Sequence, residues 1–359
     1  MPPHLDVLIA GQGLAGSLLA YQLIGLGLRA HVVDPGNAAT ASRAAAGLLS
    51  PYAGARYQAP ERLDALLAEC HHTYAMLEKA LVAPVFQPSP IWRLLQSPHE
   101  EERIAHRRQH APGRERLGPV TLGELPHGVR APWGGVCMHG GGQVHLDTLL
   151  AAVGQWLRAR KCLETGFIAP GAVTLGRNRG VRWQDRRADC VIFCDGAGAF
   201  TNPWWRALPW RHSRGETLDI EPLSGAEWPR TAITGSKSLV PLAGGRYRLG
   251  ATYERGTTAG SPSAKARNEL LAALPTLLAG RTQVRVLGGR AGMRPGSRPG
   301  PPFLGLHPSD ARIGILNGFG SRGTLLAPLY AKRLAEHLAS ARPLPPEADV
   351  HRYIGTRDP

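Results

Sequence analysis

Three glycines near the start of the chain, Gly11, Gly13 and Gly16, have the spacing of a turn that binds a dinucleotide. Gly11 permits a tight turn, Gly13 lets the backbone approach a pyrophosphate, and Gly16 lets a helix pack closely on a strand. Asp34 follows at about the distance of the acid that binds a ribose diol, and its charge would repel a 2′-phosphate. These residues predict dinucleotide binding and disfavour NADP. The alternative for the glycines alone is an ordinary Gly-rich turn.

The surrounding sequence supplies the elements that such a turn needs. Residues 6–10 are typical of a strand, and the apolar stretch 14–28 predicts a buried helix. Residues 30–34 predict a second strand that ends in the acid. The helix would begin at the turn, where its free N–H groups and dipole favour phosphate.

Later segments predict a return to the nucleotide and a second, sheet-based unit. Residues 188–198 read as a buried strand that ends in glycines, and residues 212–255 alternate as strands do. A last strand at 313–316 runs into the glycines of 318–323 and a further helix. Long helices are also expected at 60–83 and 145–158, with a short strand at 91–95.

The net charge of +15 has two readings. It could mark a nucleic-acid partner. However, lysine supplies only five of the 42 basic residues, and such a bias towards arginine equally reflects coding composition. The basic run 103–110 follows the acids 100–102, which is typical of an exposed charged helix and less often of a docking patch.

Cysteine usage and hydropathy limit the class of protein. The five cysteines include no CxxC pair, and no zinc-site spacing is present, so we expect no metal. The apolar stretch 14–28 is shorter than the roughly 20 residues of a membrane-spanning helix. No export signal is seen at the start of the chain. These features predict a cytoplasmic protein without a membrane span.

Several ordered motifs resemble the FAD-dependent amine oxidases of the D-amino-acid oxidase type. Beside the first turn they are Ser42–Pro51, Cys194–Gly198, Arg214–Leu218, Leu249–Tyr253, Gly292–Gly296 and Gly318–Pro328. Residues 292–305 look most like glycine oxidases. Residues 320–329 look more like the oxidase half of the bifunctional bacterial enzyme that makes methylaminomethyl-uridine in tRNA.

The resemblance implies an α/β fold with a Rossmann-like FAD-binding domain interleaved with an antiparallel-sheet substrate domain. At 359 residues, two domains are also expected from length. The FAD-binding domain would comprise 1–84, 140–211 and 285–340. The substrate domain would comprise 85–139 and 212–284, and 341–359 would form a tail.

The resemblance also implies which residues hold the cofactor, which is FAD bound non-covalently. The ADP half would lie on the first turn and Asp34, the pyrophosphate near Ser42 and Arg43, and the isoalloxazine along 46–48 and the closing turn. The complete implied set is Gly11, Gly13, Gly16, Asp34, Ser42, Arg43, Ala46, Gly47, Leu48, Val173, Gly196, Gly198, Gly320, Ser321, Arg322, Gly323 and Thr324.

By the same resemblance, Arg294 holds the substrate carboxylate, for which a guanidinium is suited by its two parallel donors. Arg290 lies four residues earlier, on the same face of a strand, and is a second candidate. Arg322 and Tyr253 complete the expected catalytic set, although Tyr253 could instead be a packing aromatic. The alternative for Arg294 is a surface ion pair. Glycine oxidases place a substrate-facing tyrosine before a Val-Pro step, and here that position holds Ser238.

The function implied is oxidation of the C–N bond of a small amino acid or secondary amine, by hydride transfer to flavin N5 and hydrolysis of the imine. Dioxygen is the expected electron acceptor, and no acid–base dyad is needed. One alternative is a tRNA wobble-uridine oxidase that removes a carboxymethyl group from an amine, which would make tRNA the partner. Another is a flavin dehydrogenase or a flavin-binding protein without catalysis. The sequence leaves the oligomeric state open.

Overall fold

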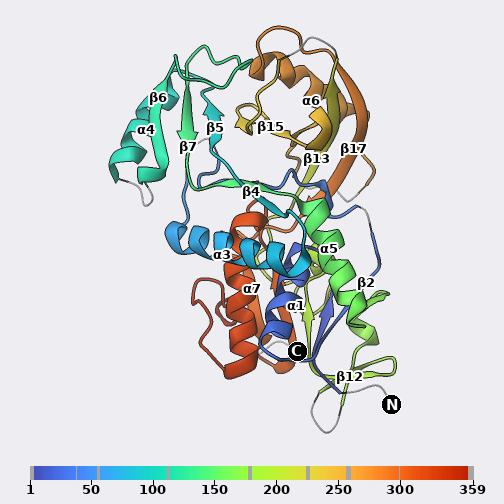
Figure 1. Cartoon of the computed structure of the whole chain (residues 1–359). Helices are drawn as coiled ribbons and strands as arrows, with labels where there is room; N and C mark the ends of the chain where they lie inside the picture. The colour runs from blue at the N-terminus through green and yellow to red at the C-terminus, as the bar shows by residue number, and fades with distance from the viewer. Residues whose placement is uncertain are drawn as a thin grey trace.

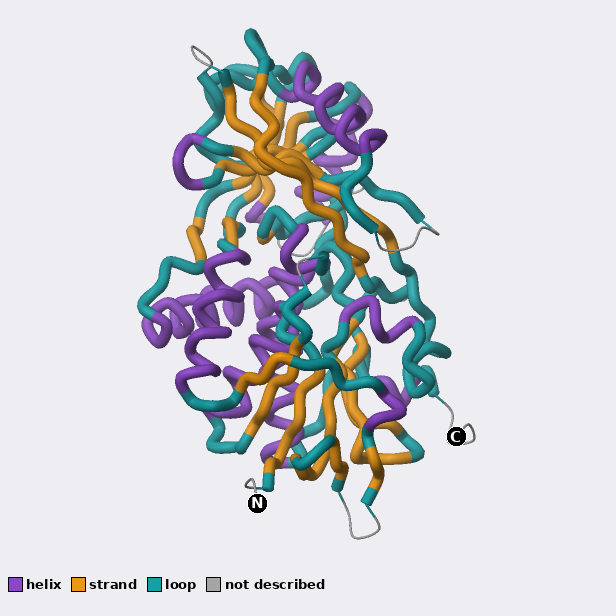
Figure 2. Tube along the Cα trace, turned by 90° about the vertical axis from the view of Figure 1, so that its right-hand side faces the viewer, coloured by secondary structure: helices purple, strands orange, loops and turns teal. Residues whose placement is uncertain are grey.

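A computed structural model describes residues 4–37, 39–54, 57–110, 114–176, 180–223, 227–255, 260–298 and 300–354. Its strands lie in two large sheets, one in each half of the molecule, with a small third sheet between them (Figures 1 and 2). Both ends of the described chain lie in the lower half, in which helices pack beside the first sheet (Figure 2). The expected α/β fold, with a parallel nucleotide-type sheet and a separate antiparallel sheet, is confirmed.

The first sheet has parallel pairing at its centre, where β1 lies between β2 and β12, and β12 also pairs with β19. Its strands are β1 (Leu5–Ala10), β2 (Ala30–Asp34), β9 (Leu163–Thr165), β10 (Thr174–Leu175), β11 (Val181–Trp183), β12 (Arg186–Phe193), β18 (Phe303–His307) and β19 (Asp310–Asn317).

Apolar residues cover both faces of this sheet. Val7 and Ile9 join the core cluster that contains α1 and α7, whereas Leu5 and Leu8 join a second cluster on the opposite face. A central parallel strand buried on both faces has a continuous apolar run, as β1 has from Val7 to Ala10. The packing therefore fixes the carboxyl ends of β1 and β12, from which the glycine turns start.

The second sheet is mostly antiparallel and runs in the order β17-β13-β16-β15-β14-β5-β7-β6. Its strands are β5 (Ile91–Leu94), β6 (Leu117–Thr121), β7 (Gly135–Met138), β13 (Ser213–Pro222), β14 (Ile233–Thr234), β15 (Ser238–Pro241), β16 (Tyr247–Gly250) and β17 (Val284–Arg294). The small sheet holds β3 (Leu48–Leu49), β4 (Phe86–Pro88) and β8 (Gly142–Val144). Residues 285–294 were expected in the FAD-binding domain, but they belong to β17, which pairs along its length with β13 in the second sheet.

Most helices surround the first sheet, and α1 packs against α7 while α3 also packs on α7. The helices are α1 (Leu14–Gly25), α2 (Ala41–Ala44), α3 (Leu63–Leu81), α4 (His99–His110), α5 (Leu146–Ala159), α6 (Ala264–Leu277) and α7 (Gly323–Ser340). In Figure 1, α4 and α6 lie in the upper half with the second sheet. No helix among the described residues is long and apolar enough to cross a membrane.

Two segments make contacts that the sequence alone does not indicate. The charged run before His110 does form α4, but Glu100 is buried, with 5% exposure, whereas Glu101 and Glu102 are exposed. The described part of the expected tail packs on the first sheet, where Leu304 donates to the carbonyl of Ala348 and Val350 is fully buried. Residues 355–359 of the tail lie outside the described residues.

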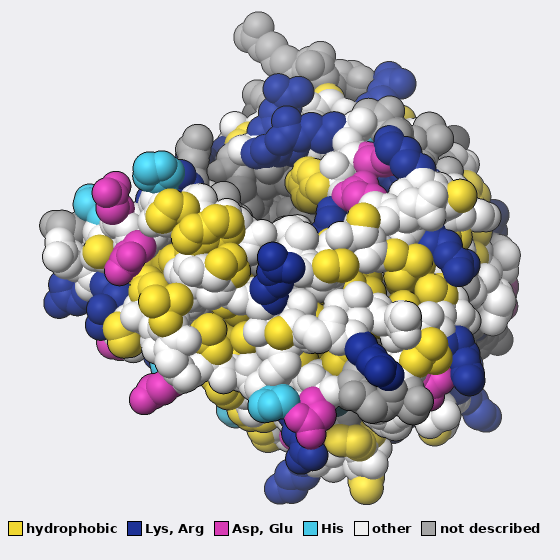
Figure 3. Space-filling model, turned by 90° about the horizontal axis from the view of Figure 1, so that it is seen from above, with side chains coloured by type: hydrophobic (Ala, Val, Ile, Leu, Met, Phe, Trp, Pro, Cys, Tyr) yellow, Lys and Arg dark blue, Asp and Glu magenta, His cyan; other side chains and the backbone are white. Residues whose placement is uncertain are grey.

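Lys and Arg side chains are spread over the face at the top of the molecule, with hydrophobic side chains between them (Figure 3). The basic composition is therefore visible on this surface of the second sheet's half.

The contact of α1 with the first turn gives a stability prediction. A Cβ at Gly16 would collide with the carbonyl oxygen of Gly11, so we expect Gly16→Ala to lower the free energy of unfolding by about 1–3 kcal/mol. Gly25→Ala in the same helix is the control, because nothing lies within 4 Å of its Cβ position. Urea denaturation compares the two, and equal midpoints would contradict the close packing at Gly16.

Candidate functional site

A cavity of about 780 Å³ lies between the first sheet's glycine turns and the second sheet. That size is within the range of small-molecule and cofactor sites. Most of the residues assigned from the sequence line it: Gly11, Gly13, Asp34, Ser42, Ala46, Gly47, Leu48, Gly196, Gly198, Tyr253, Arg294, Gly320, Ser321, Arg322, Gly323 and Thr324. The structure thus brings segments from the whole length of the chain to one cavity.

The first turn has the geometry of a dinucleotide cradle. Gly11 has a φ of 104°, and a Cβ there would lie 2.7 Å from the carbonyl oxygen of Cys194, which holds the second glycine turn alongside. The hydroxyl of Ser42 accepts a hydrogen bond from the N–H of Leu14 at 3.1 Å, at the start of α1. A bulkier residue at Gly11 would therefore push apart the two glycine turns that meet beside this helix N-terminus.

Asp34 is held at the end of β2 by the backbone. Its carboxylate oxygens accept hydrogen bonds from the N–H groups of Gln12 at 2.6 Å and Gly36 at 2.7 Å. Because these bonds leave further lone pairs on the side that faces the cavity, the carboxylate can still accept from a ribose diol. The site residues fit the adenosine end of FAD.

The segment 46–48 is fixed against the small sheet. A Cβ at Gly47 would collide with the carbonyl oxygen of Val144, whose own N–H donates to the carbonyl of Gly47 at 2.8 Å. Thr324 donates through its hydroxyl to the carbonyl of Leu48 at 2.8 Å, which ties this segment to the first residues of α7. The backbone here is therefore rigid and can lie close to a flat ring.

The closing turn presents the positive end of a long helix. Helix α7 begins at Gly323, and its first N–H groups have no partner within the helix, so they favour negative charge in the cavity. Tyr74 donates its hydroxyl to the carbonyl of Thr324 at 2.7 Å, which fixes this turn on α3. This arrangement suits a ring that becomes anionic when it is reduced.

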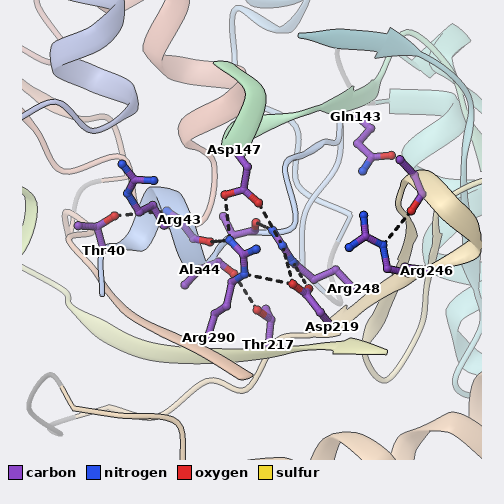
Figure 4. Close-up of polar contacts among 12 residues, drawn as sticks. Thr40, Arg43, Ala44, Gln143, Asp147, Thr217, Asp219, Arg246, Arg248 and Arg290 are labelled. Atoms are coloured by element: carbon purple, nitrogen blue, oxygen red, sulfur yellow. Dashed lines mark hydrogen bonds and ion pairs between the residues drawn. The ribbon is translucent and has the colours of Figure 1, made fainter. Parts of the chain in front are cut away.

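Four charged side chains join the second sheet to the segment before residue 46 (Figure 4). Arg248 of β16 and Arg290 of β17 both donate to the carboxylate of Asp219, at 2.7 and 3.2 Å for their Nε atoms. Both arginines also reach Asp147 of α5, Arg290 at 2.9 Å and Arg248 at 3.4 Å. The two cations and two anions compensate one another at the side of the cavity.

The two arginines of this group, together with Thr217, hold three consecutive carbonyl groups. Arg290 donates to the carbonyl of Arg43 at 3.0 Å, Thr217 to that of Ala44 at 2.9 Å, and Arg248 to that of Ala45 at 2.9 Å. Figure 4 shows these donors converging on the short helix α2 and its end. The second sheet therefore positions the backbone that leads into 46–48.

Arg290 consequently does not line the cavity with Arg294, although the two residues share β17. Its donors are engaged by Asp147, Asp219 and the carbonyl of Arg43, which gives it a positioning role. Gly16, Arg43 and Val173 are also absent from the described lining, and Phe167 and Ile168 lie at the cavity near Val173 instead.

Arg294 lies over Gly215 and faces the cavity, where a Cβ at Gly215 would collide with its guanidinium. Among the described residues, the guanidinium donates only to backbone carbonyls, those of Arg214 and Thr252, at 3.3–3.4 Å. Tyr253 covers it, with the ring centre 5.4 Å from the guanidinium carbon. Burial lowers the pKa of Arg294, and no carboxylate of the described residues forms an ion pair with it.

Arg322 is a second arginine of the cavity with few partners. Its closest polar contact among the described residues is the carbonyl of Gln58, at 3.5 Å, and burial lowers its pKa as well. Two desolvated guanidinium groups without carboxylate partners make this end of the cavity strongly attractive to an anion.

Other lining residues were not nominated from the sequence. Arg93, Ser238 and Gly250 come from the second sheet, and Asp195 lies within the second glycine motif. Asp195 and Gly250 lie within motifs recognised from the sequence, and Ser238 holds the position at which glycine oxidases have a tyrosine, whereas Arg93 had no local signal. Among the described residues, no group of three or more His, Cys, Asp or Glu side chains is placed to hold a metal ion.

The comparisons with known proteins agree with this geometry. Residues 6–337 match the FAD dependent oxidoreductase (DAO) family, and the chain belongs to that family. It is 25% identical to the glycine oxidase of Pseudomonas aeruginosa, covering 94% of this chain and 96% of that protein. It is also 25% identical to the tRNA 5-methylaminomethyl-2-thiouridine biosynthesis bifunctional protein of Paracidovorax citrulli, covering 98% of this chain but only 60% of that protein.

The fold is similar to that of the glycine oxidase of Geobacillus kaustophilus, with a TM-score of 0.80, 22% sequence identity and 99% of each chain covered. The family resemblance drawn from the sequence motifs is thereby confirmed, and the chain is an FAD-dependent oxidoreductase.

The buried network gives a prediction for stability. Asp219→Asn leaves Arg248, which is 4% exposed, with a weakened counter-charge, so we expect the free energy of unfolding to fall by about 3 kcal/mol. Glu221→Gln on the same strand is the control, because Glu221 pairs with the exposed Arg285 and should cost less than about 1 kcal/mol. Urea denaturation measures both, and a loss no larger for Asp219→Asn than for Glu221→Gln would contradict the role of the network.

Asp195 gives a prediction for pH dependence. Burial raises its pKa to about 7 against the opposing hydrogen bonds, which include those from Asn202 and Asn317. Between about pH 4 and pH 7 the unfolded chain releases this proton while the folded chain keeps it, so folding loses stability as the pH rises. The stability advantage of Asp195→Asn over the unmodified protein should therefore grow across this window and level off above about pH 8. Urea denaturation at several pH values tests this, and a pH-independent difference would contradict the buried, protonated carboxyl.

Proposed function

We propose that this chain oxidises the C–N bond of a small amino acid or secondary amine that carries a carboxylate, with FAD bound non-covalently. The observation that carries the proposal is Arg294, a partly buried and desolvated guanidinium in the cavity that no carboxylate of the described residues neutralises. A desolvated cation of this kind is costly unless a ligand supplies the counter-charge. The substrate carboxylate is that counter-charge.

FAD, when bound, supplies a two-electron acceptor that takes hydride from the amine's carbon and leaves an imine for water to hydrolyse. The residues of the chain bind the substrate and the cofactor and orient them. Arg294 fixes the carboxylate, and Tyr253 covers the guanidinium and part of the cavity mouth, as its side chain is about half exposed. Arg322 adds positive potential, and the start of α7 favours negative charge on the cofactor.

The contribution that the chain itself must make to catalysis is to position the substrate. Two carboxylates near the cofactor's expected place have other roles, since Asp34 is bonded to backbone N–H groups and burial raises the pKa of Asp195 to about 7. We therefore propose that a neutral amine reacts without an acid–base dyad, and that dioxygen is the final electron acceptor. The similarity to glycine oxidase supports an amino-acid substrate.

A second candidate function is oxidation of a carboxymethylated amine on tRNA. It is supported by the net charge of +15 and by the similarity to the tRNA-modifying bifunctional protein. The chain spans 60% of the length of that protein. The same Arg294 would bind the carboxymethyl carboxylate. Retention of tRNA that falls steeply with salt would favour this function over the first.

Anaerobic mixing of the yellow protein with a panel of amines tests both functions. The panel holds glycine, sarcosine, D-alanine, D-proline and tRNA that carries carboxymethylaminomethyl-uridine, and the flavin absorbance is followed. We expect at least one free carboxylated amine to bleach the flavin. Bleaching by tRNA alone would establish the second function, and no bleaching by any member would overturn the proposal.

Arg294 gives the matching variant. Arg294→Met should raise the KM of an oxidised amine by about a hundredfold, because a charged hydrogen-bonded pair contributes about 1.5–3 kcal/mol. Arg285→Met is the control, since Arg285 is exposed and remote on the same strand. Steady-state kinetics checks both, and an unchanged KM in Arg294→Met would show that the carboxylate binds elsewhere.

A further inference from the structure

A row of residues crosses the second sheet from Arg93 towards Arg294. Arg93 of β5 lies opposite Thr234 of β14, which lies opposite Ser238 of β15, and Gly250 and Thr217 continue the row on β16 and β13. Residues directly opposite each other on neighbouring strands point to the same face of a sheet. All five line the cavity. This face of the sheet therefore forms one continuous wall of the site.

Arg294 and Arg93 lie at opposite ends of this wall. Arg294 lies over Gly215 of β13, two residues from Thr217, whereas Arg93 is on β5, four strand spacings away. Four spacings correspond to about 19 Å between the backbones. The gap between the two guanidinium groups is shorter, because both side chains extend from the backbone into the cavity. In Figure 1, β5 and β13 indeed lie towards opposite sides of the upper half. The side chains between them are short, so a small elongated ligand fits along the wall.

Arg93 has an unused donor. Its side chain is 16% exposed, and its Nη1 donates to the carbonyl of Gly235 at 2.9 Å. Its Nε is buried and has no hydrogen-bond partner among the described residues. A buried donor left without a partner costs free energy, which an accepting ligand would recover. Arg93 thus has the properties expected of a ligand-binding group.

Glu100 orients the guanidinium of Arg93 without accepting a hydrogen bond from it. The carboxylate of Glu100 lies 3.6 Å from Nη2 of Arg93, beyond ordinary hydrogen-bond distance, and accepts the hydroxyl of Tyr57 at 2.8 Å. The Tyr57 ring centre is 5.8 Å from the Arg93 guanidinium carbon. These contacts orient the guanidinium and make its burial tolerable in the absence of a ligand.

We infer that Arg93 is a second carboxylate-binding group of the site, and that the substrate is an amine with a carboxylate at each end. This inference rests on the proposed function, because it assigns the substrate class of the same cavity. Arg294 binds the carboxylate next to the carbon that is oxidised, and Arg93 binds the distal one. Thr234 and Ser238 leave room for the chain between them.

The unmodified holoenzyme provides the first test. Three N-carboxymethyl amines are used, which carry their second carboxylate after one, two or three methylene groups: iminodiacetate, N-(carboxymethyl)-β-alanine and N-(carboxymethyl)-γ-aminobutyrate. Each is compared with the amide of its second carboxylate, which keeps the shape and removes the charge. At least one dicarboxylate should show a KM at least about tenfold below that of its amide.

A variant at Arg93 provides the second test. Because removing Arg93 alone would leave Glu100 buried without a counter-charge, the test uses the double variant Arg93→Gln/Glu100→Gln, which keeps this pair neutral. The KM of the preferred dicarboxylate should rise about tenfold to a hundredfold, whereas the KM values of its amide and of sarcosine should change little. The dissociation constant for binding of succinate, followed by the flavin absorbance shift, should rise in parallel while that for acetate does not. Arg285→Met is the matched control and should leave both ligands unaffected.

The outcomes separate this inference from the proposed function. If glycine or sarcosine bleaches the flavin but no dicarboxylate is preferred over its amide, the role of Arg93 is overturned and the proposed function stands. If the double variant weakens the binding of the dicarboxylates and of their amides equally, Arg93 only supports the fold, and the inference also fails. If no amine of either kind is oxidised, the proposed function itself fails.

Discussion

The cavity depends on one contact between the two halves of the molecule, in which the second sheet holds the backbone of residues 43–45. Three consecutive carbonyl groups there accept hydrogen bonds from Arg290, Thr217 and Arg248. The charges involved are buried or half-buried, and they are tolerable because Asp219 and Asp147 compensate them. This contact fixes the segment 46–48, which the small sheet and α7 then hold from the other side.

The walls of the cavity differ in charge along its length. At the nucleotide end they offer glycine turns, the start of α1 and the carboxylate of Asp34, all of which suit a phosphate-bearing ribonucleotide. At the other end they offer Arg294, Arg322 and Arg93, of which only Arg93 has a carboxylate neighbour among the described residues. A cofactor with phosphates and a substrate with carboxylates thus have separate places, and neither arrangement requires a metal.

What the sequence could predict was local. Gly11, Gly13 and Asp34 lie within one strand–turn–helix–strand unit, so their spacing alone indicates their geometry. Arg294 was accessible through its motif, but Arg290 shows the limit of that reasoning. Strand alternation gives both residues the same face of β17, and only the register with β13 and the position of α5 show that Arg290 meets Asp219 and Asp147 instead of the cavity.

Long-range pairing explains the other differences. Arg93 reaches the site because β5 pairs in parallel with β14, a contact that no local pattern indicates. Glu100 reads as part of a solvated charged helix, yet α4 packs so that this one carboxylate is buried between Arg93 and Tyr57. β17 likewise joins the second sheet because it pairs with β13, although it leads into the closing segments of the FAD-binding half.

The most direct test of the account is a crystal structure of the protein with FAD and acetate, a carboxylate that cannot be oxidised as an amine. The account predicts a flavin ring beside residues 46–48 and the start of α7, and the acetate carboxylate paired with Arg294. A ring placed away from both segments, or acetate bound without contact to Arg294, would contradict it.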